Sequence, residues 1–387
     1  MMSPLLSVVV PTHNRSDYAI SCIEAVLALD CPELQLVMTD TSTDGRLHEL
    51  LNQPGCAFLD DPRFLYRRIQ ARSNLTKNHN DAVALAEGEY VCIIGDDDCL
   101  TSAAIDATRW ASANEVPVVS QTQTSIYAWP DFRSMLARSG HASRLYVPRR
   151  AGRARWRDAR TDLNAALARA FQATEAMPRC YHGIVRRELL EQVREQTGAY
   201  FHGSSPDMSG AVAMACLVGQ YCEVDLPLSI SGVSSGSNSG RSAMNTHKGE
   251  LSAESQTDSF EVKGWTPGVP RFFAVETVWA HAGLETLRRM HPKGMANFNF
   301  DRLHALCTVR HPEFASKIER AAREVKTDTA AGEIRAIKLE RWKYLLRRGL
   351  LPTAAYGRRY FADLPTVADA FRCYEAYAQR FTFTPPV

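Results

Sequence analysis

The sequence of 387 residues predicts an α/β fold, with a mostly parallel sheet covered by helices on both faces and a helical C-terminal region. Apolar strand signals alternate with helical spacing over the first 120 residues, and these strands are too apolar for a sheet with one face in water. Beyond Trp265 the spacing is helical nearly to the end. Because 45% of the residues are hydrophobic, a chain of this length is expected to form two packed domains.

The first 120 residues contain repeated strand and helix units. LLSVVV, at residues 5–10, is the first strand signal, and Ser16 is expected to cap the helix that follows. The further signals are strands at 34–38 (LQLVM), 63–69 (RFLYRRI) and 89–94 (EYVCII), and a helix at about 75–86. Ligands of such sheets bind beyond the carboxyl ends of the strands. The segments to consider for function are therefore PTHNR, TDTSTDG and GDDD, each directly after a predicted strand.

The pattern becomes mixed after residue 120. It predicts a strand near Val118, a helix at 162–173, a strand at 180–187 and a helix after Pro206. In SGVSSGSNSG, residues 231–240, eight of ten residues are Ser or Gly, which predicts a linker or a mobile lid without a regular element. We therefore expect three parts, at residues 1–120, 121–240 and 241–387.

Bulk composition limits the possible partners and the compartment. Forty-five basic and 43 acidic side chains leave a formal charge of +2, so no nucleic-acid partner is expected. Ten scattered cysteines without a CxxC pair indicate the reduced thiols of a cytoplasmic protein. The N-terminal segment lacks the basic region of a signal peptide, and the longest uncharged run, residues 208–222, falls short of the ~20 apolar residues of a membrane span. No membrane crossing is expected.

Three consecutive aspartates, Asp96, Asp97 and Asp98, follow the strand signal at 89–94 in GEYVCIIGDDDCL. Like charges at the end of a strand repel one another and lose hydration, so they favour a site for a cation. A hard divalent ion with oxygen ligands, Mn²⁺ or Mg²⁺, is expected there, and it would carry the diphosphate of a nucleotide sugar. The alternative is a solvated turn, because Asp favours turns and helix caps.

The other strand ends offer groups for the rest of a nucleotide. Asp40 follows LVM directly, where its carboxylate can accept a hydrogen bond from a uracil-type N3–H. The first strand is followed by hydrogen-bonding groups and one ring able to stack, in Pro11, Thr12, His13, Asn14 and Arg15. These residues are alternatively plain turn residues.

Four motifs in order resemble the inverting family-2 glycosyltransferases with the GT-A fold. SVVVPTHNR is similar to the strand-PTYNR opening of that family, and VMTDTSTDG to its VVDDGSTDG. NDAVALAEGEYV resembles NxGxxxAxGEYI, and IGDDDCL resembles the DxDD turn. The resemblance covers about the first 110 residues and implies that this part is the nucleotide-sugar-binding half, with the acceptor-binding half and the catalytic base in residues 121–240.

The resemblance also implies roles for single residues. Asp40 would contact the base, Asp96 the ribose or its surroundings, and Asp97 with Asp98 the metal. The chain departs from the family pattern at four positions, where Thr39 replaces an aspartate, His13 a tyrosine, Gly95 an acidic residue and His79 an arginine. Because Gly95 removes one carboxylate, the aspartate that holds the ion stays open between the members of the triplet.

Further candidates lie outside these motifs. Arg72, Lys77 and Asn80 precede or begin the helix before GEY and would lie near the donor phosphates, although an exposed basic face explains Arg72 and Lys77 equally well. Inversion needs a general base, which relatives place at the start of a helix in the second half of the fold. Asp207, after Pro206, fits that place, with an aspartate that only complements the helix dipole as the alternative.

Three more features are assigned in the same way. His247 is a candidate third metal ligand, or else a surface histidine. Tyr181 and His182 are candidates for the acceptor site, or else core residues. Two basic clusters, at residues 144–160 and 335–348, are candidates for peripheral contact with the inner membrane surface, or else solvated faces.

The sequence thus predicts a metal-dependent inverting glycosyltransferase. It would move a sugar from a nucleoside diphosphate, expected to be UDP, to a hydroxyl of a glycan or lipid-linked glycan, as in bacterial surface polysaccharide synthesis. A sugar-nucleotide nucleotidyltransferase is an alternative, against which PTHNR counts because it has no glycine for a phosphate loop. A non-catalytic nucleotide- or glycan-binding protein is the other alternative, which Thr39 and Gly95 keep open.

Overall fold

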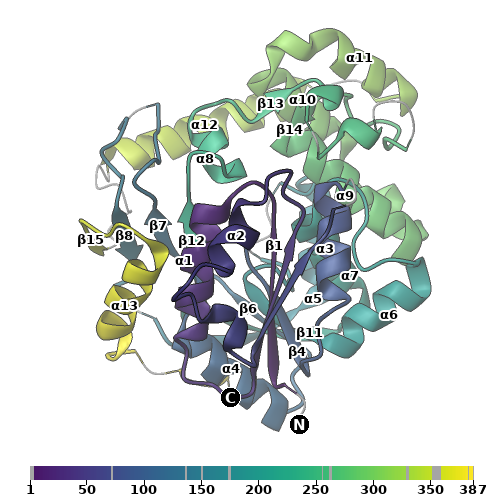
Figure 1. Ribbon diagram of the computed structural model, residues 1–387. Coiled ribbons are helices and arrows are strands. Elements are labelled where there is room, and N and C mark those ends of the chain that lie inside the picture. Colours follow the sequence, from purple (N-terminus) through teal and green to yellow (C-terminus); the bar gives the residue numbers. More distant parts are fainter. Residues whose placement is uncertain are drawn as a thin grey trace.

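The computed structural model describes residues 4–70, 73–135, 137–149, 151–172, 176–254, 256–260, 264–327, 331–350, 359–381 and 383–386, and for residues 258 and 344–350 it describes the backbone alone. A large sheet lies at its centre (Figure 1). Its eight strands are ordered β3-β2-β1-β4-β10-β6-β11-β9. The α/β fold predicted from the sequence is confirmed, and so is the helical C-terminal region.

The strands expected in the first half form the parallel part of this sheet. β1 (Leu6–Thr12) pairs with β2 (Leu34–Asp40) on one side and with β4 (Tyr90–Ile93) on the other, and β3 (Phe64–Arg68) extends the sheet beyond β2. Every residue of β2 is buried, as expected for a strand covered on both faces. The carboxyl ends of β1 and β4 therefore meet at one edge of the sheet.

The remaining strands make the sheet mixed. β10 (Gly183–Arg186) runs antiparallel between β4 and β6 (Val118–Gln121). β11 (Gln220–Val224) is parallel to β6, and β9 (Ala154–Asp158) is an antiparallel edge strand. This arrangement brings the segment before β10 beside the end of β4.

Helices cover both faces of the sheet. α1 (Ser16–Leu27) and α4 (Ser102–Ala113) share one apolar core, and α3 (Leu75–Val83), α6 (Arg187–Thr197) and α7 (Pro206–Leu217) share the other. α2 (Arg46–Leu51) follows β2, and α5 (Ala159–Ala168) follows β9. Ser16 is the first helical residue of α1 and not its cap, because the cap position belongs to Arg15, whose side chain makes no capping hydrogen bond.

A second sheet was not foreseen. Its five short strands are ordered β15-β8-β7-β12-β5. The bounds are β5 Cys99–Leu100, β7 Ser125–Ala128, β8 Arg144–Val147, β12 Ser229–Val233 and β15 Arg359–Phe361. α13 (Val367–Ala378) packs beside α1, where its Ala368 N–H donates to the Ser21 hydroxyl at 3.1 Å, so a late segment completes the first core (Figure 1).

The Ser/Gly segment at 231–240 is part of regular structure, so its prediction as a stretch without an element was wrong. Its first three residues end β12, and its last three begin α8 (Asn238–Ala243), whose cap Ser237 accepts a hydrogen bond from Gly240 N–H. At Gly232 a Cβ would overlap the carbonyl oxygen of Asp97. The close approach of the Asp97 backbone therefore requires glycine at position 232. The serines of this segment supply hydroxyl groups for hydrogen bonds, and they do not make it flexible.

The C-terminal helices have a core of their own. α9 (Val275–Met290) packs against α7, and α10 (Phe300–Arg310) packs against α11 (Ala315–Glu324) and α12 (Ala331–Leu350). β13 (Lys248–Gly249) pairs with β14 (Phe273–Ala274), and short 3₁₀ turns lie at residues 251–253, 258–260, 292–297 and 312–314. Among the described helices, none combines the length and the apolar composition needed to span a bilayer.

A buried carboxylate holds α9 to the turn after α10. Glu276 accepts hydrogen bonds from Arg310 at 2.6 Å and from His311 at 2.9 Å. Burial opposes its charge, but the His311 hydrogen bond and the Arg310 charge outweigh burial and lower the pKa of Glu276 to about 2. A depressed folded-state pKa contributes stability above the unfolded value near 4.5, and that contribution is lost as the pH falls toward 2.

Glu276→Gln is therefore expected to lower the free energy of unfolding by about 3 kcal/mol at pH 7 and by progressively less between pH 4.5 and pH 2. Urea unfolding at a series of pH values measures this. Glu319→Gln is the control, because the Glu319 side chain is 70% exposed and its pair with Arg323 spans 4.0 Å. An equal loss in both variants, or a loss for Glu276→Gln that does not change with pH, would contradict the assignment.

Candidate functional site

A cavity of about 230 Å³ lies at the carboxyl ends of β1 and β4. Several of the residues predicted from sequence line it together, namely Pro11, Thr12, His13, Arg15, Asp96, Asp97 and Tyr181. The other lining residues are Thr41, Ser73, Asn74, Leu75, Asn78, His79, Ile94, Gly95, Gly236, Ser237 and Asn238. The strand ends that were expected to converge do converge.

Arg15 is the cation at the centre of the aspartate triplet. Its Nε lies 2.7 Å from Asp96 Oδ1, and its second terminal nitrogen lies 2.8 Å from Asp97 Oδ2. The guanidinium also stands 4.6 Å from the ring centroid of Tyr18. Burial alone would lower the pKa of Arg15, but Asp96 and Asp97 reverse this and hold it above its ordinary value. A side chain of the protein thus meets much of the charge requirement that the sequence assigned to a metal ion.

Hydrogen-bond donors satisfy further carboxylate oxygens of the triplet. Thr12 Oγ1 donates to Asp96 Oδ2 at 2.6 Å, and Ser234 Oγ donates to Asp97 Oδ2 at 2.6 Å. Burial is the main cause that raises the pKa of Asp97 to about 7, with Arg15 acting in the opposite direction and the neighbouring aspartates adding to the rise. Within the described part of the chain, Asp97 Oδ1 is the triplet oxygen without a hydrogen bond, and Asp97 lines the cavity.

The Asp98 side chain points into the protein, where it holds neighbouring backbone segments together. Its Oδ2 accepts from Gly95 N–H at 2.6 Å and lies 3.2 Å from His182 Nε2, and its Oδ1 accepts from Gly232 N–H at 2.7 Å. Its role as a metal ligand therefore receives no support from the geometry. The glycine at 95 is explained as well, because a Cβ there would stand 2.9 Å from Asp98 Oδ2 and 3.1 Å from Tyr181 Oη.

Asp40 lies below the cavity floor. It is fully buried, with Oδ2 accepting from Tyr66 Oη and Oδ1 accepting from Ser42 N–H, each at 2.8 Å. Its neighbour Thr41 lines the cavity instead. Asn14 stands at the rim in a left-handed conformation with φ 55°, and its side-chain oxygen accepts from Thr43 N–H at 2.9 Å.

The three candidates that precede the GEY motif, Arg72, Lys77 and Asn80, do not share one environment. Asn80 Oδ1 accepts from the backbone N–H groups of Tyr200 and Phe201 at 2.8 and 3.0 Å, so it clamps the segment that leads to α7 and does not line the cavity. Lys77 pairs with Asp81 at 2.6 Å on the exposed face of α3. Arg72 lies outside the described residues.

Residues of the Ser/Gly segment and of α3 belong to the site although sequence reasoning did not place them there. Ser234 bonds both Arg15, at 2.8 Å, and Asp97. Asn78 accepts from Thr39 Oγ1 at 2.7 Å, which accounts for the threonine at a family aspartate position. The density of hydroxyls at 231–240 was the available signal, but without known partners it indicated only flexibility.

Asp207 is near the triplet but is not part of the cavity lining. It lies in the first turn of α7, half-buried, and accepts a hydrogen bond from Ser205 Oγ. Tyr181 is half-buried and lines the cavity, and desolvation of its hydroxyl together with the charges of Asp98, Asp97 and Asp207 raises its pKa well above the usual value. The charge of Asp207 and the charges of the triplet therefore act on the same side chain, Tyr181.

His182 and His247 do not reach the cavity. His182 links Asp98 to Ser229, whose hydroxyl lies 2.8 Å from its Nδ1, which is the core role that was the alternative. His247 lines a different cavity of about 670 Å³ together with Glu276, Arg310 and His311. Burial lowers its pKa to about 4, and its Nδ1 lies 3.0 Å from Ser242 Oγ.

The Arg-rich stretch at 144–160 is partly neutralised. Arg155 pairs with buried Glu223 of β11, and Arg157 pairs with buried Asp162 of α5, so these two arginines hold the edge strand β9 to its neighbours. Arg144 stands over the ring of Tyr360, 4.9 Å from its centroid. The second basic cluster lies on α12.

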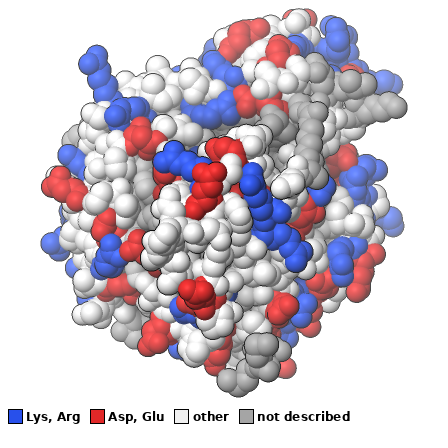
Figure 2. Space-filling model, viewed as in Figure 1, with Lys and Arg blue, Asp and Glu red and all other residues white. Residues whose placement is uncertain are grey.

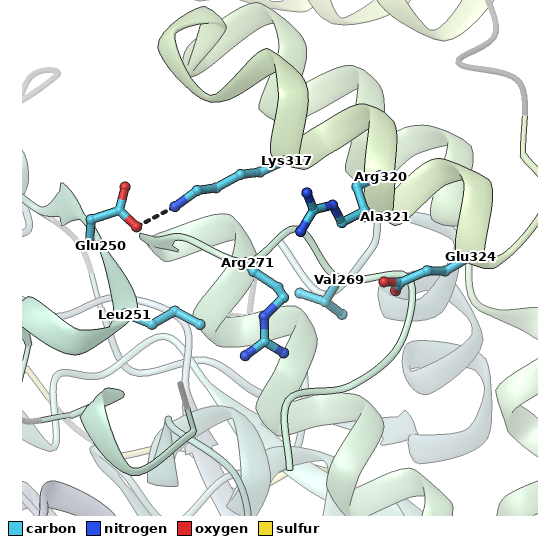
Figure 3. Close-up of a pocket in the computed structure, with 8 residues that line it drawn as sticks. All are labelled: Glu250, Leu251, Val269, Arg271, Lys317, Arg320, Ala321 and Glu324. Carbon is cyan, nitrogen blue, oxygen red and sulfur yellow. Dashed lines mark hydrogen bonds and ion pairs between the residues drawn. The ribbon is translucent and has the colours of Figure 1, made fainter. Parts of the chain in front are cut away.

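Another cavity, of about 210 Å³, lies in the C-terminal region between α11 and the loop before α9 (Figure 3). Arg271, Lys317 and Arg320 line it together with Glu250 and Glu324. Lys317 pairs with Glu250, and Glu324 accepts from Gly268 N–H at 2.9 Å. It shares no lining residue with the cavity at β1 and β4.

The triplet accommodates a divalent ion only in a restricted way. In the described part of the chain, no group of three or more His, Cys, Asp or Glu side chains is arranged to hold a metal ion. Mg²⁺ is commonly bound by one or two carboxylates together with substrate phosphates rather than by a complete protein cage. Asp97, with Oδ1 not engaged, fits that kind of ion, whereas Asp98 and His247 do not.

The sequence model of glycosyl transferase family 2 matches residues 7–150, which include all of β1 but its first residue, the aspartate triplet and every strand between them. This part of the chain is therefore similar to the glycosyl transferase family 2 domain. The match and the mixed sheet agree with the GT-A fold expected from the motifs.

Curated relatives match a quarter or slightly more of the chain. WcaA of Escherichia coli, named for colanic acid biosynthesis, is 36% identical over 96 residues, which are 25% of this chain and 33% of that protein. The GalNAc(5)-diNAcBac-PP-undecaprenol beta-1,3-glucosyltransferase of Campylobacter jejuni is 30% identical over 113 residues, 29% of this chain and 35% of that protein. The chain thus spans about a third of the length of these relatives.

Solved structures resemble a larger share of the chain at low identity. TarS 1–349 of Staphylococcus aureus in complex with UDP-GlcNAc has a TM-score of 0.46 and 16% identity, covering 82% of this chain and 89% of that one. The mannosyltransferase PcManGT of Pyrobaculum calidifontis, in complex with GDP-Man and Mn²⁺, has a TM-score of 0.42 and 15% identity, covering 98% and 87%. The fold is therefore assigned from the strands and helices of this chain alone.

Proposed function

We propose that this protein is an inverting glycosyltransferase that moves a sugar from a nucleoside diphosphate, UDP in particular, to a hydroxyl of a glycan or lipid-linked glycan. The observation that carries the proposal is the cavity at the ends of β1 and β4, where Arg15, Asp96 and Asp97 meet inside a family-2 domain. A cation and two carboxylates at the carboxyl ends of parallel strands suit a diphosphate and its counterion.

The cavity suits only part of the donor. Its volume of about 230 Å³ is below the roughly 300 Å³ at which clefts for complete small ligands begin. The diphosphate and the sugar would occupy it, and the base would lie at the rim beside the exposed ring of His13, whose Nδ1 is held by Thr41 O at 2.8 Å. His13 would bind the base by stacking, and Asp40 would hold the floor beneath it.

The proposal includes a divalent ion that arrives with the diphosphate and is held on the protein by Asp97. When bound, the ion would stabilise the negative charge that develops on the leaving diphosphate. Arg15 is adjacent and adds a fixed positive charge to the same region. Asp96, held by Thr12 and Arg15, would face the ribose.

Asp207 is proposed as the general base. It would accept the proton of the acceptor hydroxyl as that oxygen attacks the anomeric carbon from the side opposite the diphosphate. Ser205, which donates to Asp207, would orient its carboxylate, and Tyr181 would separate it from the triplet.

Glycan acceptors and a reducing compartment belong to the same proposal. The names of two relatives refer to colanic acid and to an undecaprenol-linked glycan, which supports an acceptor of the surface polysaccharide type. All ten cysteines are free and most are buried, which supports work in the cytoplasm.

A donor screen tests the proposal. Purified protein is incubated with UDP-, GDP- and dTDP-sugars, with Mn²⁺ or with EDTA, and release of the nucleoside diphosphate is measured. We expect release from UDP-sugars that is at least tenfold faster with Mn²⁺, since the ion stabilises the leaving group by at least about 1.4 kcal/mol. Nucleotide binding without release under any condition would favour the non-catalytic alternative, and release that EDTA leaves unchanged would remove the ion from the proposal.

A further inference from the structure

α12 presents an unusual outer face. Leu339 is 50% exposed and Trp342 is 59% exposed, and two exposed large apolar residues on one helix face are more informative than single ones. Arg335, Leu339 and Trp342 are spaced by four and three residues, so they form one stripe along the helix. Lys338 and Lys343 lie on the two sides of that stripe and are exposed as well.

The opposite face of α12 anchors the helix to the protein. Ile337 is 3% exposed and packs with Ala305 and Leu306 of α10. Arg302 of α10 pairs with Glu333 at 3.2 Å and with Glu340 at 2.8 Å, so both acidic residues of α12 are engaged there. The outward face is therefore left with positive charges around an apolar stripe.

This combination selects the kind of partner. An amphipathic helix lies in a bilayer interface when aromatic and aliphatic residues form its apolar face and Lys or Arg flank it. Tryptophan is enriched at that depth because its ring is amphipathic. In Figure 2 lysine or arginine side chains project from the upper left of the molecule, the region where Figure 1 places α12.

We propose that the outer face of α12, formed by Arg335, Lys338, Leu339, Trp342 and Lys343, docks on a membrane surface that carries anionic phospholipid headgroups. This inference concerns attachment and stands independently of the donor chemistry proposed above. The Arg-rich stretch at 144–160 is the rival surface, but there Arg155 and Arg157 are bound to Glu223 and Asp162.

Co-sedimentation with vesicles tests the docking. Full-length protein is mixed with vesicles of phosphatidylcholine alone or of phosphatidylcholine with phosphatidylglycerol. We expect binding at least about tenfold tighter to the anionic vesicles. Lys338→Gln/Lys343→Gln should weaken it about twenty-five-fold, at about fivefold for each cation removed. Leu339→Gln/Trp342→Gln should weaken it at least about tenfold, because the apolar stripe no longer enters the interface.

Matched variants separate docking from general effects. Leu59→Gln/Trp156→Gln removes two apolar residues that are each 41% exposed, and its tryptophan belongs to the rival surface. Lys293→Gln/Lys326→Gln removes two exposed lysines elsewhere. All variants should keep the same UDP affinity and far-UV spectrum. Equal binding to neutral and anionic vesicles, no binding to either, or a loss in the control pairs as large as in the α12 pairs would overturn the proposal.

Discussion

Asp207→Asn is expected to lower the turnover number of sugar transfer by about 10²- to 10⁴-fold and to leave the affinity for UDP unchanged. The amide retains the shape of the carboxylate but cannot accept the proton of the attacking hydroxyl. The cavity does not include Asp207 among its lining residues, so donor binding has no contact to lose. Initial rates under saturating donor and acceptor, together with calorimetric titration of UDP, measure both quantities.

The control for this variant is another acidic residue in the first turn of a helix. Glu188 lies in the first turn of α6 and its side chain is 61% exposed, so Glu188→Gln removes the same kind of dipole partner without touching the site. Its turnover should stay within a factor of two or so of the parent. If Asp207→Asn retained the turnover of the parent protein, the general base would have to be another residue.

Arg15→Ala is expected to reduce the free energy of unfolding by about 3–5 kcal/mol and to abolish detectable donor release. It removes the shared cation of Asp96 and Asp97, which lie buried at 5% and 6% exposure, and so leaves uncompensated charge inside the protein. Chemical unfolding followed by tryptophan fluorescence measures the stability, and the nucleotide-release assay measures the activity.

Two comparisons make the Arg15 prediction specific. Arg46→Ala breaks the ion pair between Arg46 and Asp17, whose side chains are 59% and 67% exposed respectively. This variant should lower the free energy of unfolding by at most about 1 kcal/mol. Arg15→Met combined with Asp97→Asn should recover part of the stability, because one of the buried charges is removed along with its partner. If Arg15→Ala and Arg46→Ala were equally stable, Arg15 would not be the cation that balances the triplet.

Local patterns were sufficient to predict the strands and the position of the triplet. The apolar runs near residues 5, 34, 63 and 89 became β1 to β4, because a buried parallel strand needs little beyond a short apolar sequence. The same rule placed Thr12, His13, Arg15, Asp96 and Asp97 around one cavity, since parallel strands end at the same edge.

The partners of the triplet could not be predicted, because they depend on distant parts of the chain. The hydrogen bond from Arg15 to Ser234 joins residues 219 positions apart, and the one from Gly232 to Asp98 joins residues 134 apart. No periodicity or spacing indicates such contacts. Three like charges therefore suggested a metal ion, although Arg15, the last residue of the SVVVPTHNR motif, supplies a counterion to Asp96 and Asp97.

Composition was also a poor guide to order. Serine and glycine at 231–240 predicted a flexible segment, yet their small size allows β12 to approach the backbone of Asp97 and their hydroxyls supply the donors that Asp97 and α8 require. The short strands of the second sheet were not predicted, because an alternation of apolar and polar residues cannot be recognised over two to five residues.

The position of α13 beside α1 constrains how the protein is made. Phe371 and Tyr374 of α13 lie in the same core as Ile23 and Val26 of α1. The apolar face of α1 is therefore incompletely covered until more than 340 further residues have been synthesised. The hydrogen bond from Ala368 to Ser21 spans 347 positions in the same way. A ribosome-bound chain would expose that surface for much of its elongation, when aggregation competes with folding. Premature termination before α13 should therefore yield an insoluble product rather than a shortened enzyme.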